Sequence, residues 1–317
     1  MEFHFDYHTI ASIVRTATES KTRISELVLK QQADQLERSE EDIFRQMENN
    51  YQVMTACIDP GSEKDIRSTS GLTGGSAYKM RQVSESGKSL TGSLMSSALY
   101  RALAVSELNA AMGRIVAAPT AGSCGILPAA VLTMEAEKGC SHDDCVMALF
   151  TASAVGMVIA DNACLAGAEG GCQAECGSAA AMAAAALVQM LGGTPEQALD
   201  ASSIALSNLL GLVCDPVGGL VEVPCQNRNA IGVAAAFSSA QLALAGIKSL
   251  VPFDQMAHVM LSVGHALPAT LRETAKGGIA QAPAALSACA KCGMLLYRQV
   301  FASQECLIDS LTCPFDC

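Results

Sequence analysis

The sequence predicts an all-α protein that folds as one compact helical domain. Apolar residues recur at helical spacing in several segments, and few runs show the alternation of β-branched residues that is typical of strands. Stretches rich in glycine and proline separate these segments. The apolar residues are mostly Ala, Leu, Val, Met and Cys, and there is no Trp. We therefore expect a core of small side chains between close-packed helices.

Sequence signals indicate where each expected helix and loop lies along the chain. Residues 7–57 show helical periodicity with charged faces, and Ser39 caps a helix there whose first turn carries three acids. Gly-rich or irregular loops are expected over 59–75 and 116–125. Thr194 as N-cap, with proline and an acid directly after it, marks another helix start. The remaining helices are expected over residues 88–112, 126–138, 141–158, 179–191, 194–212, 229–247, 252–263 and 284–301.

No linker or internal repeat divides the chain, so we expect one domain with three parts. The N-terminal helices cover residues 1–57, the core that carries the chemistry covers 58–278, and a C-terminal tail of unknown role covers 279–317. A chain with 50% hydrophobic and only 16% charged residues is not disordered.

The charge and hydropathy patterns exclude some partners. The net charge is −11 and the pI is about 4.9, which argues against nucleic-acid binding because phosphate contacts need clustered Lys and Arg. The charge-free stretch 145–160 has 16 residues, fewer than the roughly 20 that a membrane-spanning helix needs. Residues 1–6 lack the basic and apolar regions of a secretory signal, so we expect a cytoplasmic protein without a membrane partner.

The 14 cysteines should then be reduced, which leaves metal ligation and burial as their roles. Cys172, Cys214 and Cys225 each lie at a break marked by glycine or proline. Cys172 and Cys225 precede expected helix starts, where unpaired backbone N–H groups favour a thiolate. Three thiolates are one short of a structural zinc site. They suit a 4Fe–4S cluster with one iron left open, held by the Gly-rich loops between helices.

Other cysteines compete for this role. Cysteine is among the most often buried residue types, so any of the 14 could be a small core residue. Cys176 follows Cys172 by four residues and is an alternative ligand. Cys289 and Cys292 form a CxxC pattern, but no second CxxC matches it and the segment is helix-like, so we expect this pair to be inert.

Several motifs together resemble the alpha (catalytic) chain of iron–sulfur-dependent L-serine dehydratase, or L-serine ammonia-lyase, over about residues 40 to 280. The motifs are SGLTGG at 70–75, APTAGSCGILP at 118–128, EGGCQAE at 169–175, CDPVGG at 214–219, PC at 224–225 followed by RNA at 228–230, and ETA at 273–275 followed by GG at 277–278.

The resemblance implies a reaction and a cofactor. L-serine would be deaminated to pyruvate and ammonia by a 4Fe–4S cluster acting as a Lewis acid, without pyridoxal phosphate. Cys172, Cys214 and Cys225 would be the cluster ligands, 42 and 11 residues apart as in the family pattern. Some relatives carry an additional N-terminal regulatory domain that this chain lacks, which implies a separate beta chain and a hetero-oligomer.

Two loops are candidates for binding the substrate carboxylate. The first supplies backbone N–H groups and hydroxyls in a Gly-rich bend, and the second lies ahead of an expected helix start. Arg228, the first positive charge after a span without Lys or Arg (139–227), could bind the same carboxylate, offset cluster charge or form a structural ion pair. The candidate loop residues are Ser70, Gly71, Thr73, Gly74, Thr120 and Ser123, with the first loop favoured.

The base that removes the Cα proton is left open among Lys79, Glu169 and His265, which qualify by chemistry alone. Two other functions use the same thiols. One is a cluster lyase of the L-cysteine desulfidase type, with threonine as a further candidate substrate. The other is an iron or redox sensor, which would not need the two substrate loops. The tail has no assigned role; its cysteines are Cys289, Cys292, Cys306, Cys313 and Cys317.

Overall fold

A computed structural model describes residues 9–291, and this part of the chain is helical, with a single isolated bridge between Cys214 and Arg272 in place of strands. The all-α prediction is confirmed for these residues. The helices are α1 Ile10–Ser20, α2 Ile24–Gln35, α3 Glu40–Ala56, α4 Ile58–Gly61, α5 Ser76–Glu85, α6 Gly92–Ala110, α7 Ile126–Lys138, α8 His142–Asn162, α9 Gly167–Gly170, α10 Ser178–Met190, α11 Pro195–Ser207, α12 Cys225–Leu244, α13 Phe253–Ala266 and α14 Pro283–Lys291.

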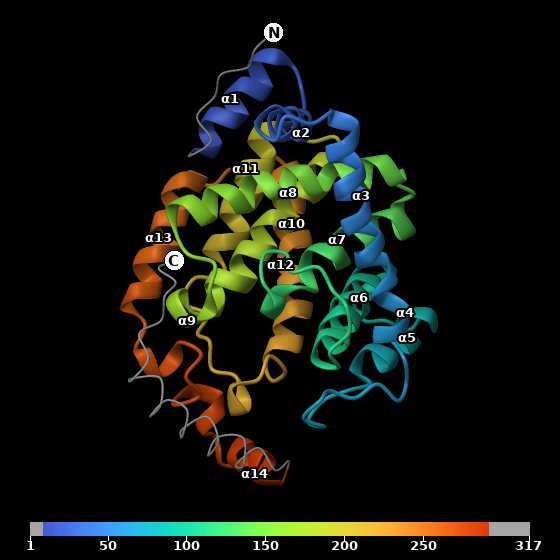
Figure 1. Cartoon of the computed structure of the whole chain (residues 1–317), viewed down its shortest axis with the longest axis vertical. Helices are drawn as coiled ribbons and strands as arrows, with labels where there is room; N and C mark the ends of the chain where they lie inside the picture. Colours follow the sequence, from blue (N-terminus) through green and yellow to red (C-terminus); the bar gives the residue numbers. More distant parts are fainter. Residues whose placement is uncertain (1–8, 292–317) are drawn as a thin grey trace.

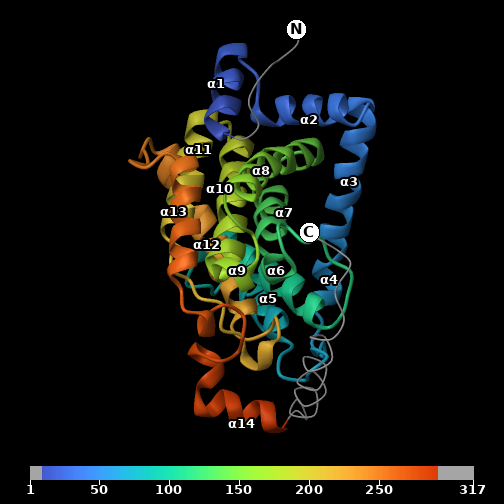
Figure 2. The same cartoon turned by 60° about the vertical axis from the view of Figure 1, so that its left-hand side comes forward.

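Helix α10 forms the centre of the molecule, and helices α7, α8, α11 and α12 pack around it (Figure 1). Its residues from Ser178 to Val188 are all buried, and seven of them are alanines. Alanine has the highest helix propensity and lets neighbouring backbones approach closely. Figure 2 shows α3 and α13 on opposite sides of this inner layer. The expected core of small side chains between close-packed helices is confirmed.

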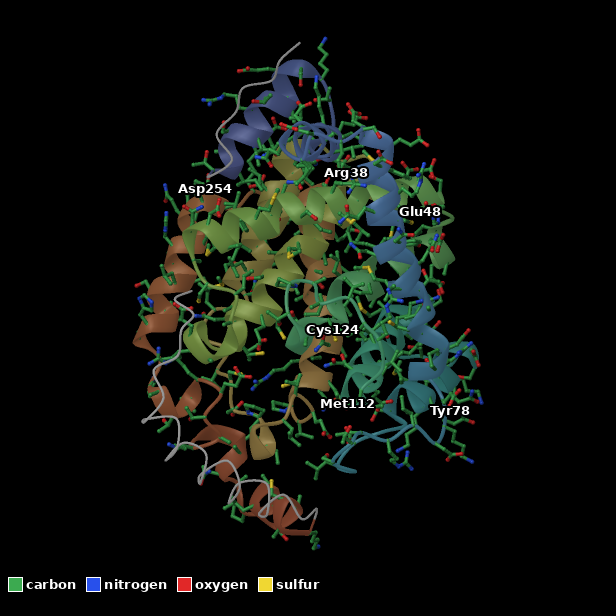
Figure 3. The ribbon with its side chains drawn as sticks, viewed as in Figure 1. Arg38, Glu48, Tyr78, Met112, Cys124 and Asp254 are labelled. Carbon is green, nitrogen blue, oxygen red and sulfur yellow. The ribbon has the colours of Figure 1, made fainter. Side chains whose placement is uncertain are left out.

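Helices α3 and α11 begin where the sequence predicts, because each has a capping residue next to its first turn. The Ser39 hydroxyl accepts a hydrogen bond from the backbone N–H of Asp42, and the Thr194 hydroxyl accepts one from that of Gln197. Helix α1 is capped from a distance instead. The Asp254 carboxylate at the start of α13 accepts hydrogen bonds from the first N–H groups of α1 (Figure 3).

Several expected boundaries differ from the structure, and the helix expected over 229–247 begins earlier, at Cys225. Helix α5 lies in a segment with no expected helix, because no local cap marks its start; its first N–H groups are bound by Glu107 of α6, which is distant in sequence. The helix expected over 194–212 ends at Ser207, and Gly211 then turns the chain with φ +80°. The helix expected over 284–301 begins as α14, and its later residues lie outside the described part.

Helix α8 is long and apolar enough, by length and composition, to cross a membrane. Its most apolar stretch is 72% buried inside this structure, against neighbours that include α2, α7 and α10. A core helix of this kind passes the same test of length and hydropathy. Burial among other helices therefore accounts for its composition.

Candidate active site

Three segments of the chain bring Cys172, Cys214 and Cys225 close enough for neighbouring thiols to influence one another's pKa. Cys172 directly precedes a π-helical turn, Gln173–Gly177, that continues into α10. Cys214 follows α11, and Cys225 is the first residue of α12. All three are at least 96% buried. Burial, and secondarily the nearby charge of Cys172, raises the pKa of Cys214 far above its ordinary value and that of Cys225 to about 12.

Cys176 is in direct contact with Cys172. Their sulfur atoms are 3.4 Å apart, and both side chains are buried. This hydrogen bond lowers the pKa of Cys172 and raises that of Cys176. The positive charge of Arg228 lowers the pKa of Cys172 further. Cys172 is therefore the thiol in this group that most readily becomes a thiolate.

Glu175 lies among these thiols, and the sequence reasoning did not select it. One of its carboxylate oxygens accepts a hydrogen bond from the Thr120 hydroxyl at 2.8 Å, and the other is 4.0 Å from the Cys214 sulfur. A Cβ on Gly122 or Gly167 would lie 2.7 or 2.6 Å from this carboxylate, so two loop backbones enclose it. Burial raises the pKa of Glu175 above its ordinary value.

The signal for Glu175 was present in the sequence. It is one of the few acids in a long span without Lys or Arg, and it stands between two cysteines of a Gly-rich motif. Burying a carboxylate in such apolar surroundings costs folding free energy unless the carboxylate is hydrogen-bonded. That cost makes it a functional candidate.

Arg228 forms a buried ion pair. Its guanidinium donates to the Asp215 carboxylate at 2.8 Å and to the Val213 carbonyl at 2.7 Å. The other Asp215 oxygen accepts the Ile279 N–H at 2.7 Å. The structural ion pair considered from the sequence is thus present, and the same cation also acts on Cys172.

The first candidate loop binds carboxylates of the chain itself. The hydroxyls of Ser70 and Thr73 both donate to one carboxylate oxygen of the buried Glu222, each at 2.9 Å. Gly74 has φ +144°, and a Cβ there would lie 2.1 Å from the Ile66 carbonyl oxygen. Gly71 also has a positive φ, +77°, but faces open space. Both hydroxyls expected to bind substrate are therefore already engaged.

The second candidate loop is fixed to the start of α12. The Asn229 side chain accepts the N–H of Gly125 at 2.8 Å and donates to the carbonyl of Gly122 at 2.7 Å. Ser123 is fully buried, and its hydroxyl is 3.2 Å from that of Thr120. Through Asn229 and Thr120, this loop is tied to the segments that carry Cys225 and Glu175.

A strained segment completes the surroundings of Cys214. The Cys214 N–H donates to the Leu271 carbonyl at 2.9 Å, and its carbonyl accepts the Glu273 N–H at 2.7 Å. Glu273 and Ala275 both have left-handed backbone conformations, with φ of 60° and 53°. The Glu273 carboxylate also raises the pKa of Cys214 and Glu175.

The three candidate bases lie elsewhere. Lys79 is exposed on α5, Glu169 on the short α9 and His265 in the last turn of α13. Within the described residues, none of the three side chains contacts one of the three thiols. The structure therefore does not bring these candidates into the cluster of cysteines. Cys289 is partly buried in α14, and the remaining tail cysteines lie outside the described residues.

The donor set fits an iron–sulfur cluster in chemistry. Thiolates are the usual ligands of such clusters, and three come from three different segments here. A Cβ on Gly167 would lie 2.9 Å from the Cys214 sulfur, so the backbone passes close to a thiol, as such a site requires. Between residues 9 and 291, however, no three His, Cys, Asp or Glu side chains converge tightly enough to form a preformed metal site.

Comparison with known proteins identifies relatives over most of the chain. Residues 19–280 match the family model described as serine dehydratase alpha chain. The chain is 46% identical over 277 residues to the probable L-serine dehydratase alpha chain of Bacillus subtilis, covering 87% of this chain and 92% of the relative. It is 45% identical over 273 residues to the L-serine dehydratase alpha chain of Peptoniphilus asaccharolyticus, covering 86% and 94%. L-serine dehydratase 1 of Escherichia coli is 38% identical over 253 residues, covering 76% of this chain and 55% of the relative.

Proposed function

Because this chain belongs to the serine dehydratase alpha chain family, we propose that it catalyses the deamination of L-serine to pyruvate and ammonia. The observation that carries the proposal is the meeting of three buried thiols from distant segments with Glu175 and Arg228. Such a site concentrates perturbed acids and nucleophiles, which is typical of a catalytic centre. It lies in segments that the family model covers.

The cofactor that we propose is a 4Fe–4S cluster held by Cys172, Cys214 and Cys225. When bound, the cluster would supply Lewis acidity, which makes the hydroxyl group of serine a better leaving group. The proposal includes no pyridoxal phosphate. The residues present fit this group because they supply soft thiolate ligands. The same reasoning predicts that activity is lost in air.

The residues of the chain would bind and orient serine around this centre. Arg228 adds a positive charge beside the thiols and is held in place by Asp215. Thr120 is oriented by Glu175, and its hydroxyl lies beside that of Ser123. A substrate carboxylate needs such donors, because an unpaired carboxylate in a buried site costs several kcal/mol. We propose Arg228, Thr120 and Ser123 as its donors.

The Ser70–Gly75 loop has a different part in this proposal. Its two hydroxyls hold Glu222, which lies one helical turn before Cys225. Serine also carries an ammonium group, and a buried carboxylate beside the site is a suitable acceptor for it. The loop would then act on the substrate through Glu222 rather than by direct contact with the substrate carboxylate.

The proposal includes a separate beta chain as a partner and a cytoplasmic location. The relatives that this chain covers almost completely are named as alpha chains, which implies a companion. The ten cysteines between Cys57 and Cys289 that the structure describes are all free thiols, which is typical of a reducing compartment.

The decisive experiment is a substrate screen under argon. The chain would be reconstituted with iron and sulfide, alone and with its beta chain, and the 2-oxo acid product would be measured. That product is pyruvate from L-serine or L-cysteine and 2-oxobutyrate from L-threonine. Pyruvate from serine supports the proposal. Pyruvate with sulfide from cysteine alone would indicate a desulfidase. A stable cluster without turnover in the presence of the beta chain would indicate a sensor.

A further inference from the structure

We propose that Cys172 and Cys176 form a peroxide-sensitive thiol pair, which closes to a disulfide when Cys172 is not bound to metal. The inference concerns Cys176, which has no role in the proposed dehydratase reaction. It makes the Cys172 thiol a modification site as well as a ligand, with hydrogen peroxide as the small oxidant.

The geometry of the π-helical turn places the two sulfur atoms next to each other. They are 3.4 Å apart, whereas a disulfide bond is about 2.05 Å long. Residues four apart in a helical segment have Cα atoms separated by roughly 6 Å, within the range that disulfides span. The Cβ atoms of such residues are roughly 5–6 Å apart on a helix, against about 3.5–4.5 Å across a disulfide. Side-chain rotation together with a small tightening of this turn therefore closes the bond.

The pairing is specific among the described residues. The Cys214 sulfur has the carboxylate of Glu175 as its contact, and the Cys57 thiol donates to backbone carbonyls. Within residues 9–291, Cys172 and Cys176 are the cysteines whose sulfur atoms contact each other directly. An oxidised Cys172 thus meets the Cys176 thiol before any other.

Burial selects the oxidant. Cys172 is 1% exposed and Cys176 is fully buried, so a disulfide-bearing peptide or cofactor is too large to reach either sulfur. Hydrogen peroxide is little larger than water. Small neutral molecules of this size can enter a buried site through minor fluctuations of the loops.

The chemistry is balanced in two steps. The Cys172 thiolate attacks one peroxide oxygen, which breaks the O–O bond, releases hydroxide and leaves Cys172 as a sulfenic acid. The Cys176 sulfur then attacks the Cys172 sulfur, the S–O bond breaks, and the hydroxyl leaves as water with the Cys176 proton. In total, two thiols and one peroxide give one disulfide and two waters, so the thiols lose the two electrons that peroxide gains.

The consequence is protection of a ligand. A sulfenic acid without a neighbouring thiol is oxidised further to a sulfinic acid, which thiol reductants do not reverse. A disulfide is reversible by ordinary thiol exchange. Cys176 would therefore return Cys172 to a state that can bind metal again.

The sequence provides a direct test, because the protease that cleaves after glutamate separates the two cysteines at Glu175. Cys172 is released in peptide 170–175, Cys176 in 176–196, Cys214 in 197–222 and Cys225 in 223–273. The full-length chain would be stripped of metal with a chelator under argon, treated with one equivalent of hydrogen peroxide, alkylated, digested and examined by mass spectrometry. We expect peptides 170–175 and 176–196 to be joined, and to separate when a reductant is added before alkylation.

Two variants make the result interpretable. Cys176→Ser should lose the joined species and stop at a Cys172 sulfenic acid, which a second equivalent of peroxide converts to a sulfinic acid. Cys145→Ser, which removes a buried thiol of α8, should retain the joined peptides. Circular dichroism would check that both variants fold. The inference would be wrong if, in the unsubstituted chain after peroxide treatment, peptide 170–175 were joined to 197–222 or 223–273. It would also be wrong if peptide 170–175 stayed unjoined. The readout needs neither a cluster nor serine turnover, so it is independent of the proposed function.

Discussion

Glu175 combines three properties that suit a general base. It is nine-tenths buried, its carboxylate touches both the Thr120 hydroxyl and the Cys214 thiol, and burial raises its pKa. A raised pKa makes a carboxylate a stronger base than an exposed one. Among the acids of the described site, Glu175 is therefore better placed to accept the Cα proton than the exposed Glu169.

We expect Glu175→Gln to lower kcat by about 100-fold or more, the usual effect of removing a general base. The glutamine oxygen can still accept the hydrogen bond from Thr120, but the amide cannot take up a proton. Steady-state kinetics would be measured together with cluster absorption, which should not change. The matched control is Glu169→Gln on α9, which should retain full activity; the opposite pattern would return the role of base to Glu169.

The ligand assignment gives a second prediction at the residue scale. Serine in place of Cys172, Cys214 or Cys225 should abolish the brown absorption of the reconstituted protein, because each change removes a thiolate ligand. Iron and sulfide analysis would quantify the loss. Cys145→Ser should keep the absorption. Retention of the cluster in all three site variants, with loss in Cys289→Ser, would move the site to the C-terminal cysteines.

Substrate binding gives a third prediction. Arg228→Lys should raise the KM for serine about tenfold to a hundredfold, as expected when a hydrogen bond between charged groups worth roughly 1.5–3 kcal/mol is weakened. Thr73→Val should change KM less, because the Thr73 hydroxyl already donates to Glu222. The measurement is initial rates with the cluster spectrum recorded in parallel. A strong KM effect in Thr73→Val alone would support direct binding of the substrate carboxylate by the first loop.

The residues of the site were only partly predictable from the sequence. Cys172, Cys214 and Cys225 could be selected because glycines and prolines mark their loops, and the resemblance specified the same positions. The partners that hold the loops could not, because Glu107, Glu222 and Asn229 act across 30 to 152 residues of chain. Such long-range hydrogen bonds leave no local pattern.

At the scale of single helices, the sequence predicts a helix start where the cap is local. It does not predict one where the cap comes from a residue distant in sequence. Helices α3 and α11 carry their own caps and were expected. Helix α5 was missed because its cap comes from α6: the buried Glu107 carboxylate accepts the N–H groups of residues 75, 76 and 77 at 3.1, 2.7 and 3.2 Å. A carboxylate at a helix N-terminus satisfies these donors and complements the helix dipole.

Helix α5 therefore gives a stability prediction. Glu107→Ala should lower the free energy of unfolding by at least about 2 kcal/mol, because buried N–H groups would lose a charged acceptor. Urea unfolding followed by circular dichroism would measure this. Glu85→Gln on the same helix removes an exposed ion pair with Arg81 and should cost less than about 1 kcal/mol. Equal losses of unfolding free energy in the two variants would show that the Glu107 cap stabilises the protein no more than the exposed ion pair does.

At the scale of the whole molecule, one helical domain carries the thiols, and its relatives divide into two kinds. This chain covers 92% and 94% of two relatives named as alpha chains. It covers only 61% and 55% of two relatives named simply as L-serine dehydratase, from Streptomyces coelicolor and Escherichia coli. The longer proteins contain, in one polypeptide, a further segment that has no counterpart in the match. The two relatives named as alpha chains imply a companion chain, and we propose that a companion of this chain supplies a comparable segment.

This leads to a prediction about assembly. The chain reconstituted under argon should have little serine dehydratase activity alone and gain at least about tenfold when its beta chain is added, since binding a partner that completes a site raises the fraction of competent enzyme. Size-exclusion chromatography with light scattering should show a complex larger than the 32.8 kDa chain. The control is a mixture of the beta chain with the Cys172→Ser variant of this chain. This mixture should form the same complex without activity. Full activity of this chain as an isolated monomer would show that the helical domain alone holds every group the reaction needs.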